Sequence, residues 1–298
     1  MAETGMWTAD DVARVLREPT ASDDKYSRGV LGVRTGSDAY PGAAVLGVEA
    51  AWRTGLGMVR YLGAQMPTGL VLQRRPETVV VDGRVQAWLI GSGTDAANRS
   101  PGEVIALRGI LSGSEPVVVD AGALDLAVGA RAPRVVTPHA REHARLRAAL
   151  ELADDDAAGD DDAAGDDAAD DARVASARGT AAALGATVLL KGAVTVVATP
   201  EGWTRRVTAP TAWLATAGTG DVLGGILGAL VAGSGATEAE ALGPLAASAA
   251  WLHGRAGMLA SAARGGGPVT ALDIARAVSH AVGEILGGGA SGGATPAS

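Results

Sequence analysis

Short apolar runs alternate with longer amphipathic stretches from about residue 29 to residue 208. Each run has the length of a buried strand and ends in a glycine or polar turn, while apolar residues in the intervening stretches recur at helical spacing. Such alternation predicts βαβ units, which form a mostly parallel sheet covered by helices on both faces. The predicted strands are 29–33, 58–62, 79–81, 88–90, 116–120, 135–139 and 187–192, followed by a hairpin of 194–198 with 204–207.

The helices are marked by their start signals. Pro41 stands at an early helical position, where a missing N–H group is tolerated. Three pairs have the spacing of a capping box: Thr8 with Asp11, Thr237 with Glu240, and Thr270 with Asp273. The predicted helices are 8–18, 41–52, 101–111, 142–152, 172–184, an apolar helix after residue 221, one that begins at Pro244, and 270–285.

One segment accounts for the whole of the chain's net charge of −8. Ten of the 33 acidic residues are aspartates between Asp154 and Asp171, with no Lys or Arg among them, so the remainder of the chain has a net charge of +2. A segment with so little apolar surface cannot form a core. We expect a disordered insertion at 154–171, a disordered tail of small residues at 287–298, and a single domain over 1–286.

Composition excludes several classes of protein. The 298 residues are 47% hydrophobic and 19% charged, which is typical of a globular chain with a substantial core. Cysteine is absent, which excludes disulfides and thiolate catalysis. The amino terminus lacks the apolar stretch of a signal peptide, and no apolar run is long enough to span a bilayer. We therefore expect a cytoplasmic protein that binds neither membranes nor nucleic acid.

The stretch Ala217-Gly-Thr-Gly-Asp221 precedes an apolar run with helical spacing, so Asp221 falls in the first turn of a helix. Unpaired N–H groups and the helix dipole make such a start an anion site, and glycine lets a phosphate approach the backbone. A carboxylate there would repel a phosphate. Asp221 is either a helix cap or a base that acts on a hydroxyl group being phosphorylated.

Four more polar or glycine positions end or follow predicted strands: Gly93, Asp120, His139 and Lys191. Each has an ordinary structural interpretation, such as a turn residue or a solvated strand end. Ligands of parallel sheets bind beyond the carboxyl ends of the strands, which is where all four converge. Neither a complete dinucleotide fingerprint nor a Walker A motif is present.

The motifs in this order resemble the ADP-dependent NAD(P)H-hydrate dehydratases of the ribokinase-like superfamily. They are Lys25-Tyr-Ser-Arg-Gly29, Gly36-Ser-Asp38 with Pro41-Gly-Ala-Ala44, Gly91-Ser-Gly-Thr94, Val119-Asp-Ala-Gly-Ala-Leu124, Thr137-Pro-His139, Lys191-Gly192 and Gly218-Thr-Gly-Asp221. The match extends from about residue 25 to 285. It implies a three-layer αβα sandwich. Many bacterial relatives carry an additional epimerase domain, for which this chain has no room, so we expect a stand-alone dehydratase.

The resemblance implies that a nucleotide phosphorylates the C6 hydroxyl of hydrated NADH or NADPH, after which phosphate leaves. Asp221 would be the catalytic base and would contact this substrate. Implied nucleotide-binding residues are Lys191, Gly192, Ala193, Val194, Thr195, Thr219 and Gly220, and further implied substrate-binding residues are Ala44, Gly93 and His139. ADP, or ATP, is the implied co-substrate together with Mg²⁺, for which no protein ligand is assigned. A homo-oligomer such as a tetramer is expected.

Two segments depart from the family pattern. The usual Thr-Pro-His-Pro-Gly-Glu reads Thr-Pro-His-Ala-Arg-Glu at 137–142, and the usual Asn-Pro-x-Gly is replaced within 209–214. Two alternatives stay open beside the dehydratase. One is a thiazole or pyrimidine vitamin-precursor kinase of the same superfamily, and the other is a non-catalytic nucleotide-binding regulator.

Overall fold

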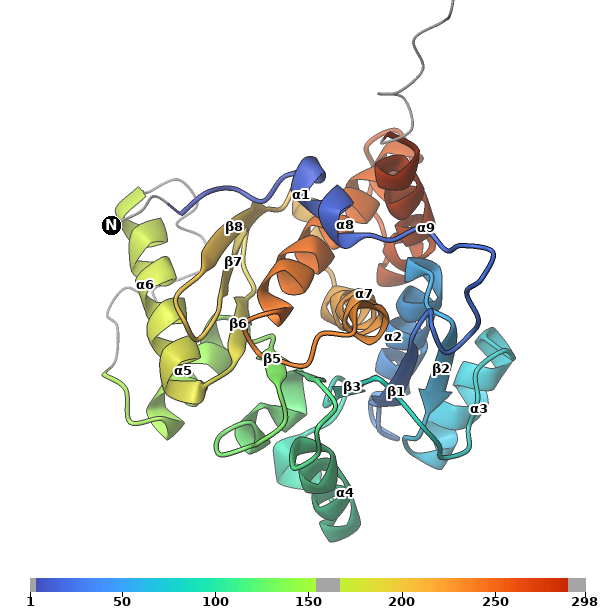
Figure 1. The fold of residues 1–298 in the computed structure, drawn as a ribbon, viewed down its shortest axis with the longest axis horizontal. Helices are drawn as coiled ribbons and strands as arrows, with labels where there is room; N and C mark the ends of the chain where they lie inside the picture. The colour runs from blue at the N-terminus through green and yellow to red at the C-terminus, as the bar shows by residue number, and fades with distance from the viewer. Residues whose placement is uncertain (1–3, 154–166, 289–298) are drawn as a thin grey trace, which may run out of the picture.

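The chain is built around one mixed sheet. The computed structural model describes residues 4–153 and 167–288, and within them the strand order is β2-β1-β3-β4-β5-β6-β7-β8 (Figure 1). Strands β1 to β6 run parallel to one another, and β7 runs antiparallel to both of its neighbours, β6 and β8. The bounds are β1 Val30–Arg34, β2 Met58–Tyr61, β3 Ala87–Ile90, β4 Val117–Val119, β5 Arg134–Val136, β6 Thr187–Leu190, β7 Val194–Ala198 and β8 Thr204–Thr208. The predicted mostly parallel α/β architecture is confirmed.

Helices cover both faces, which gives the three-layer αβα sandwich. Successive strand side chains point to opposite faces, so Leu89 joins one core cluster and Ile90 the other. The cluster around Leu89 contains residues of α1 (Ala9–Val15), α2 (Pro41–Thr54), α3 (Gln65–Arg74), α7 (Thr219–Ser234), α8 (Leu242–Ala262) and α9 (Ala271–Gly288). The cluster around Ile90 contains residues of α4 (Pro101–Leu111), α5 (Ala140–Ala149) and α6 (Asp167–Leu184).

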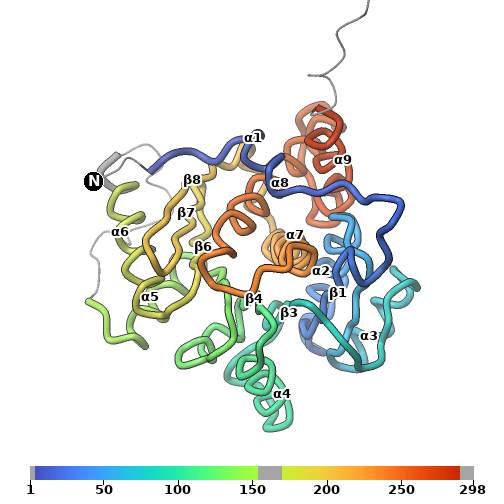
Figure 2. The backbone as a smooth tube through the Cα atoms, viewed as in Figure 1, coloured from blue at the N-terminus to red at the C-terminus, as the bar shows by residue number. Residues whose placement is uncertain are grey.

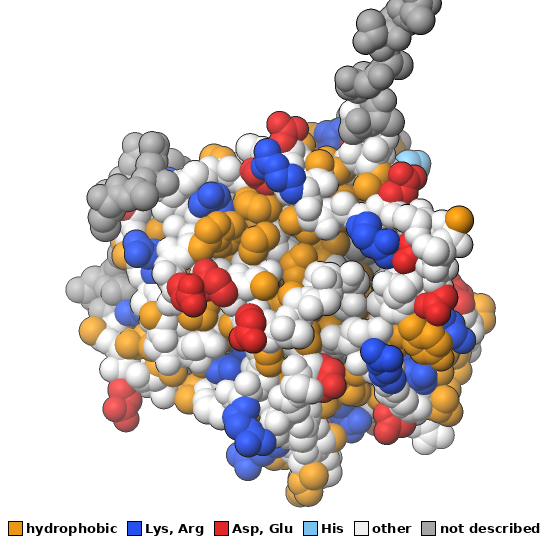
Figure 3. All heavy atoms as spheres, viewed as in Figure 1, with side chains coloured by type: hydrophobic (Ala, Val, Ile, Leu, Met, Phe, Trp, Pro, Cys, Tyr) orange, Lys and Arg blue, Asp and Glu red, His pale blue; other side chains and the backbone are white. Residues whose placement is uncertain are grey.

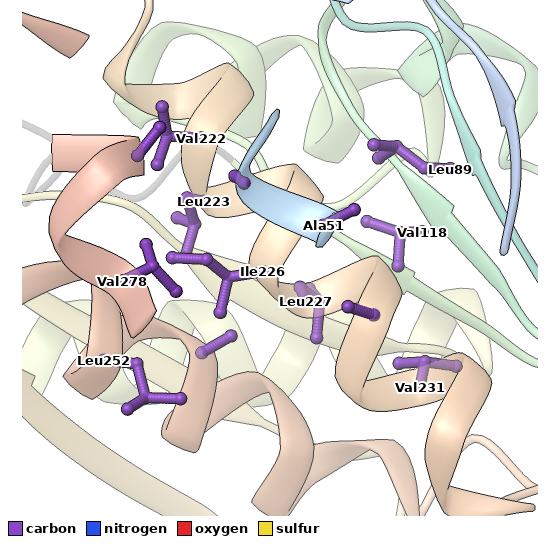
Figure 4. Packing of buried hydrophobic residues seen from close by; sticks show 14 of the residues in the cluster. Ala51, Leu89, Val118, Val222, Leu223, Ile226, Leu227, Val231, Leu252 and Val278 are labelled. Atoms are coloured by element: carbon purple, nitrogen blue, oxygen red, sulfur yellow. The ribbon is translucent and has the colours of Figure 1, made fainter. Parts of the chain in front are cut away.

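Helix α7 lies at the centre of the larger cluster. Val222, Ile226 and Leu227 are buried among α2, α8, α9 and the sheet (Figure 4). Gly47 of α2 and Gly225 of α7 meet backbone to backbone, because a Cβ atom on Gly225 would clash with the carbonyl oxygen of Gly47. The missing side chain therefore allows the two helices to pack at close range, about two turns from where each begins.

The amino-terminal segment runs along the outside of the fold from β8 past α8 toward β1 (Figure 2). The Trp7 amide donates to the Arg206 carbonyl oxygen at 2.9 Å, and the Trp7 indole N–H donates to Ser248 at 3.1 Å. The predicted capping box at the start of α1 is confirmed, since Thr8 and Asp11 exchange hydrogen bonds.

Three predictions about elements were wrong. Residues 79–81 form no strand, and only Val79 makes a bridge, to Arg60 at the edge of the sheet. Helix α3 was not predicted, because its sequence contains Pro67 and Gly69 and its apolar face is narrow. The predicted capping box of Thr237 with Glu240 is absent: Glu240 lies in a turn and accepts hydrogen bonds from Thr199 and Glu201.

The boundaries of the two segments expected to be disordered also need correction. Helix α6 already begins at Asp167, so residues 167–171 of the acidic segment are helical. Asp170 and Asp171 belong to its first turns, where the helix dipole favours carboxylates. Helix α9 continues to Gly288, so the tail starts later than residue 287. Residues 154–166 and 289–298, on which the rest of these predictions falls, lie outside the described residues.

The surface carries charges of both signs. On the face in Figure 3, Lys and Arg side chains alternate with Asp and Glu rather than forming a field of one sign. Among the helices in residues 4–153 and 167–288, none combines the length and apolar character required to cross a bilayer.

Candidate active site

Helix α7 begins at the turn that the sequence singles out. Gly218 has a φ of 89°, which favours glycine, and Asp221 lies in the first turn. The Thr219 hydroxyl donates to the Leu214 carbonyl oxygen at 2.9 Å, and the Thr219 amide donates to Thr216 at 3.3 Å. The Thr219 amide is thus partly engaged by the loop. Gly220, whose missing side chain would lie 3.8 Å from Lys191 Nζ, is better placed to meet a phosphate oxygen.

Asp120 is the centre of a hydrogen-bond network at the carboxyl edge of the sheet. It follows β4 and is only 4% exposed. Ser92, after β3, donates to Oδ2 at 2.9 Å; Thr137, after β5, donates to Oδ1 at 2.7 Å; Lys191, after β6, donates to Oδ1 at 3.0 Å. One carboxylate therefore ties together the ends of four neighbouring strands.

This network keeps two of its members charged. Burial would raise the pKa of Asp120, but the Lys191 ammonium and the three hydrogen bonds hold the pKa below its usual value. Burial would lower the pKa of Lys191, but Asp120, Glu142 and Asp221 together raise it. The nearest oxygen of Glu142 lies 3.7 Å from Lys191 Nζ. A cation whose side chain is only 21% exposed is thereby fixed beside the start of α7.

Asp221 behaves differently from Asp120. Burial and the negative charge of Asp120 raise its pKa from 3.8 to about 7, although Lys191 acts in the opposite direction. No hydrogen bond from the described residues to the Asp221 carboxylate offsets its burial, unlike the three that Asp120 accepts. A carboxyl group with a pKa near neutrality can take up and release a proton at physiological pH.

Four small residues pack closely where α2 begins. Gly93 (φ 65°) leaves no room for a side chain, because a Cβ atom there would clash with Ala43. A Cβ atom on Gly36 would lie 2.9 Å from that of Ala44, which is fully buried. The structure thus brings Ala44 and Gly93 together on the α2 side of the site. A ligand here would meet backbone rather than long side chains.

His139 is the N-cap of α5 and lies on the opposite side of the network. Its Nδ1 accepts from the Arg141 amide at 3.2 Å, and its own amide donates to Glu142 at 2.9 Å. The capping box is therefore complete although the family's Pro-Gly pair is replaced at this position. The His139 side chain is 45% exposed, and its Nε2 lies 3.6 Å from Glu142 Oε1, so a ligand can reach the ring beside that carboxylate.

Five of the seven predicted nucleotide-binding residues lie where β6 turns into β7, and the other two, Thr219 and Gly220, begin α7. Lys191 to Thr195 form a tight turn whose carbonyl oxygens at Lys191 and Val194 accept from Arg173. The Ala193 carbonyl oxygen accepts from the Ala209 amide at 3.0 Å. The altered 209–214 segment is thereby joined to the nucleotide side of the site at one end, and its Leu214 carbonyl oxygen binds the Thr219 hydroxyl at the other.

Several members of the site were not predicted. Ser92 and Thr137 have no sequence signal beyond standing at strand ends, and hydroxyl groups are common there. Glu142 could have been found, because it lies three residues after His139 at capping-box spacing. His253 of α8 is buried beside the Thr219 carbonyl, and burial lowers its pKa to about 4, so it is neutral.

A pocket of about 560 Å³ opens beside these groups. It lies between the 93–96 segment, the 3₁₀ turn η2 (Ala121–Leu126) and α5, and both Gly93 and Glu142 line it. Ala121, on its wall, has a φ of 44°, which is strained for a residue other than glycine. Among the described residues, no cluster of three His, Cys, Asp or Glu side chains suits a metal ion.

The chain is similar to known proteins over most of its length. Residues 31–280 match the family model described as NAD(P)H-hydrate dehydratase. The chain is 43% identical over 247 residues, 78% of its length, to the bifunctional NAD(P)H-hydrate repair enzyme of Mycobacterium tuberculosis, but covers only 47% of that protein. It is 33% identical to the ADP-dependent (S)-NAD(P)H-hydrate dehydratase of Neisseria meningitidis, covering 84% of this chain and 83% of the relative.

A solved structure shows the same fold. The ADP/ATP-dependent NAD(P)H-hydrate dehydratase of Bacillus subtilis, co-crystallised with ATP and Mg²⁺, superposes with a TM-score of 0.78 at 25% identity and covers 96% of this chain and 100% of that one. The present chain spans about half the length of the bifunctional relatives that it matches. The fold, the site geometry and these matches together show that the chain belongs to the NAD(P)H-hydrate dehydratase family.

Proposed function

We propose that this chain is an ADP-dependent (S)-NAD(P)H-hydrate dehydratase. The observation that carries the proposal is Asp221, a carboxyl group with a pKa near 7 at a helix start suited to phosphate. A mere helix cap would gain from a low pKa, because the ionised form is the better acceptor for the helix N–H groups. A base for a hydroxyl group gains from the pKa that Asp221 has.

In the proposed reaction, the C6 hydroxyl of the hydrated nicotinamide attacks the β-phosphorus of ADP, and Asp221 accepts the hydroxyl proton. AMP leaves as the phosphoryl group moves to the hydroxyl oxygen. The C6–O bond then breaks with electrons from the ring nitrogen, phosphate leaves, and loss of a proton from C5 restores NADH or NADPH. Lys191 and the Gly220 amide stabilise negative charge on the phosphoryl group during transfer.

The substrates occupy opposite sides of Asp221 under this proposal. The 191–195 turn and the start of α7 hold the adenine nucleotide, with Lys191 as a point charge near its phosphates. Gly93 and His139 contact the hydrated dinucleotide, and Ala44, which is fully buried, supports this side of the site through its packing against Gly36. Mg²⁺ fits this arrangement when it is bound mainly by the nucleotide's phosphate oxygens, as is usual for this ion, and it would reduce the charge on those oxygens.

The decisive assay follows NADH absorbance after the chain is mixed with NADH hydrate and either ADP or ATP. We expect absorbance to recover only when a nucleotide is present, with AMP and phosphate formed from ADP in equal amounts. No recovery with either nucleotide would refute the proposal. It would then favour a small-molecule kinase, which would consume ATP with a thiazole or pyrimidine alcohol, or a regulator, which would consume nothing.

A further inference from the structure

Two glycines on one face of α8 seat the altered segment 209–214. A Cβ atom on Gly254 would lie 2.8 Å from Pro210, and one on Gly257 would lie 2.7 Å from Leu214. Residues three apart in a helix share a face, so both contacts come from the same side of α8. Because neither glycine has a side chain, the segment rests directly on the α8 backbone at these two points.

Trp213 anchors the same segment at a further point. Its indole N–H donates to the Gly266 carbonyl oxygen at 3.0 Å, in the turn that follows α8. That turn is tied to the last residues of α8, because the Gly266 amide donates to the Ser261 carbonyl oxygen at 2.9 Å and the Ser261 hydroxyl donates to Gly267 at 2.8 Å. The Trp213 side chain is exposed, so its contribution is this anchor to the end of α8 rather than burial in the core.

The anchored segment in turn holds the start of α7. The Thr216 hydroxyl donates to the Trp213 carbonyl oxygen at 3.0 Å. The Thr219 hydroxyl donates to the Leu214 carbonyl oxygen at 2.9 Å. Gly218, the N-cap of α7, has no side chain with which to cap the helix, so these two hydroxyl groups connect the first turn to the loop. A displacement of residues 213 and 214 would therefore reach the turn that carries Asp221.

Resting on the proposed function, we propose that Trp213 is a positioning residue for phosphoryl transfer. It fixes the 209–214 segment to the end of α8 and thereby holds Gly220 and Asp221 where they meet the phosphoryl group and the hydroxyl group, without touching either substrate. The family's usual Asn-Pro-x-Gly is replaced in this segment, so the anchor belongs to this chain's own loop. The effect on rate is large because a misplacement of about 1 Å can slow a reaction about a hundredfold.

The test measures kcat and the KM values for ADP and hydrated NADH in two variants. Trp213→Phe keeps a ring but cannot donate to Gly266, so kcat should fall roughly three- to tenfold. Trp213→Ala removes the anchor altogether, and kcat should fall roughly ten- to a hundredfold. In both variants kcat/KM should fall by the same factor, because the lost positioning matters in the transition state. Trp52→Phe, which removes an indole hydrogen bond of 3.0 Å to Thr78 elsewhere in the fold, is the matched control and should keep the wild-type kcat.

A double-mutant cycle separates positioning from a general loss of stability. If Trp213 acts through the Thr219 hydroxyl, Trp213→Ala should lower kcat little further once Thr219→Val has removed that hydroxyl, and should have its full effect in Thr219→Ser, which keeps it.

Three results would each overturn the inference while the proposed function stands. They are independent losses of kcat in the Thr219→Val background, a kcat of Trp213→Ala equal to that of Trp52→Phe, and a raised KM for ADP at unchanged kcat. The last would show that the indole contacts the nucleotide directly. If the wild-type chain fails to restore NADH at all, the proposed function itself fails.

Discussion

Replacing Asp221 by asparagine should abolish most turnover and at the same time stabilise the folded chain. Turnover should fall by about two to four orders of magnitude, because asparagine cannot accept the hydroxyl proton. Stability should rise because the partly buried carboxylate, raised in pKa from 3.8 to about 7, opposes folding whenever it is ionised. The same change thus separates the function of Asp221 from its effect on the fold.

The magnitude follows from the pKa. A shift of about three units at about 1.4 kcal/mol each sets a ceiling of about 4 kcal/mol on the folding cost of ionised Asp221. The asparagine amide must also be desolvated and loses the attraction of Lys191, so we expect a gain of about 1–3 kcal/mol above pH 7. Below about pH 4 the carboxyl is protonated in both states, so the gain is absent. It grows between pH 4 and 7, where only the unfolded chain ionises, and is complete above 7.

The assay is urea unfolding of the wild type and Asp221→Asn at pH 5 and pH 8, together with turnover on hydrated NADH. Asp10→Asn, which removes an exposed carboxylate of α1, is the control and should unfold like the wild type at both pH values. An equal stability difference at pH 5 and pH 8 would show that Asp221 has no raised pKa. Turnover near the wild-type value would exclude it as the base.

Three further changes test the surroundings of Asp221. Asp120→Asn should move the acid limb of the pH profile of kcat/KM to lower pH by about one unit, because the Asp120 charge contributes to the raised pKa of Asp221. An acid limb that stays in place would show that the Asp120 charge does not raise the pKa of Asp221. Gly93→Ala should lower the free energy of unfolding by about 1–3 kcal/mol more than Gly129→Ala, because Gly129 has a similar φ but no atom near the position of an added Cβ. Equal losses of stability would mean that the packing against Ala43 is loose. Ala121→Gly should raise the urea midpoint of unfolding, and the free energy of unfolding by about 0.5–1 kcal/mol, because glycine adopts a φ of 44° without strain. A lower midpoint would show that the backbone at Ala121 is not strained.

The sequence predicted the elements whose signals are local. The apolar runs that became β1 and β3 to β6 lie between turns that contain glycine or proline, and they are buried on both faces, so they read as continuous apolar stretches. Residues 79–81 show the limit of this signal. Three consecutive valines have high strand propensity, but here they come after α3 and pass beside the edge strand β2. Only Val79 forms a bridge to that strand, at Arg60. Whether a segment pairs as a strand depends on the neighbouring strand and on its burial, and the local sequence pattern does not carry that information.

Part of the candidate site could likewise be predicted from the sequence, and part of it could not. That Asp120, His139 and Lys191 meet at one edge follows from strand polarity alone and is confirmed by the geometry around Lys191. The hydrogen bonds from Ser92 and Thr137 to Asp120 could not be predicted, because they depend on rotamers and on register between strands far apart in the sequence. The raised pKa of Asp221 depends on burial and on the distance to a second carboxylate, which are properties of the folded chain.

The contact between Gly47 and Gly225 gives the site its dimensions. Helix α2 carries Ala44 and α7 carries Asp221, and the two are separated by a backbone contact rather than by layers of side chains. The distance between the starts of α2 and α7, where Ala44 and Asp221 lie, is therefore set by the main chain at this contact rather than by how the surrounding valines and leucines pack. Core substitutions elsewhere can accumulate without altering that distance, whereas a single methyl group at residue 225 would widen it from two helical turns away.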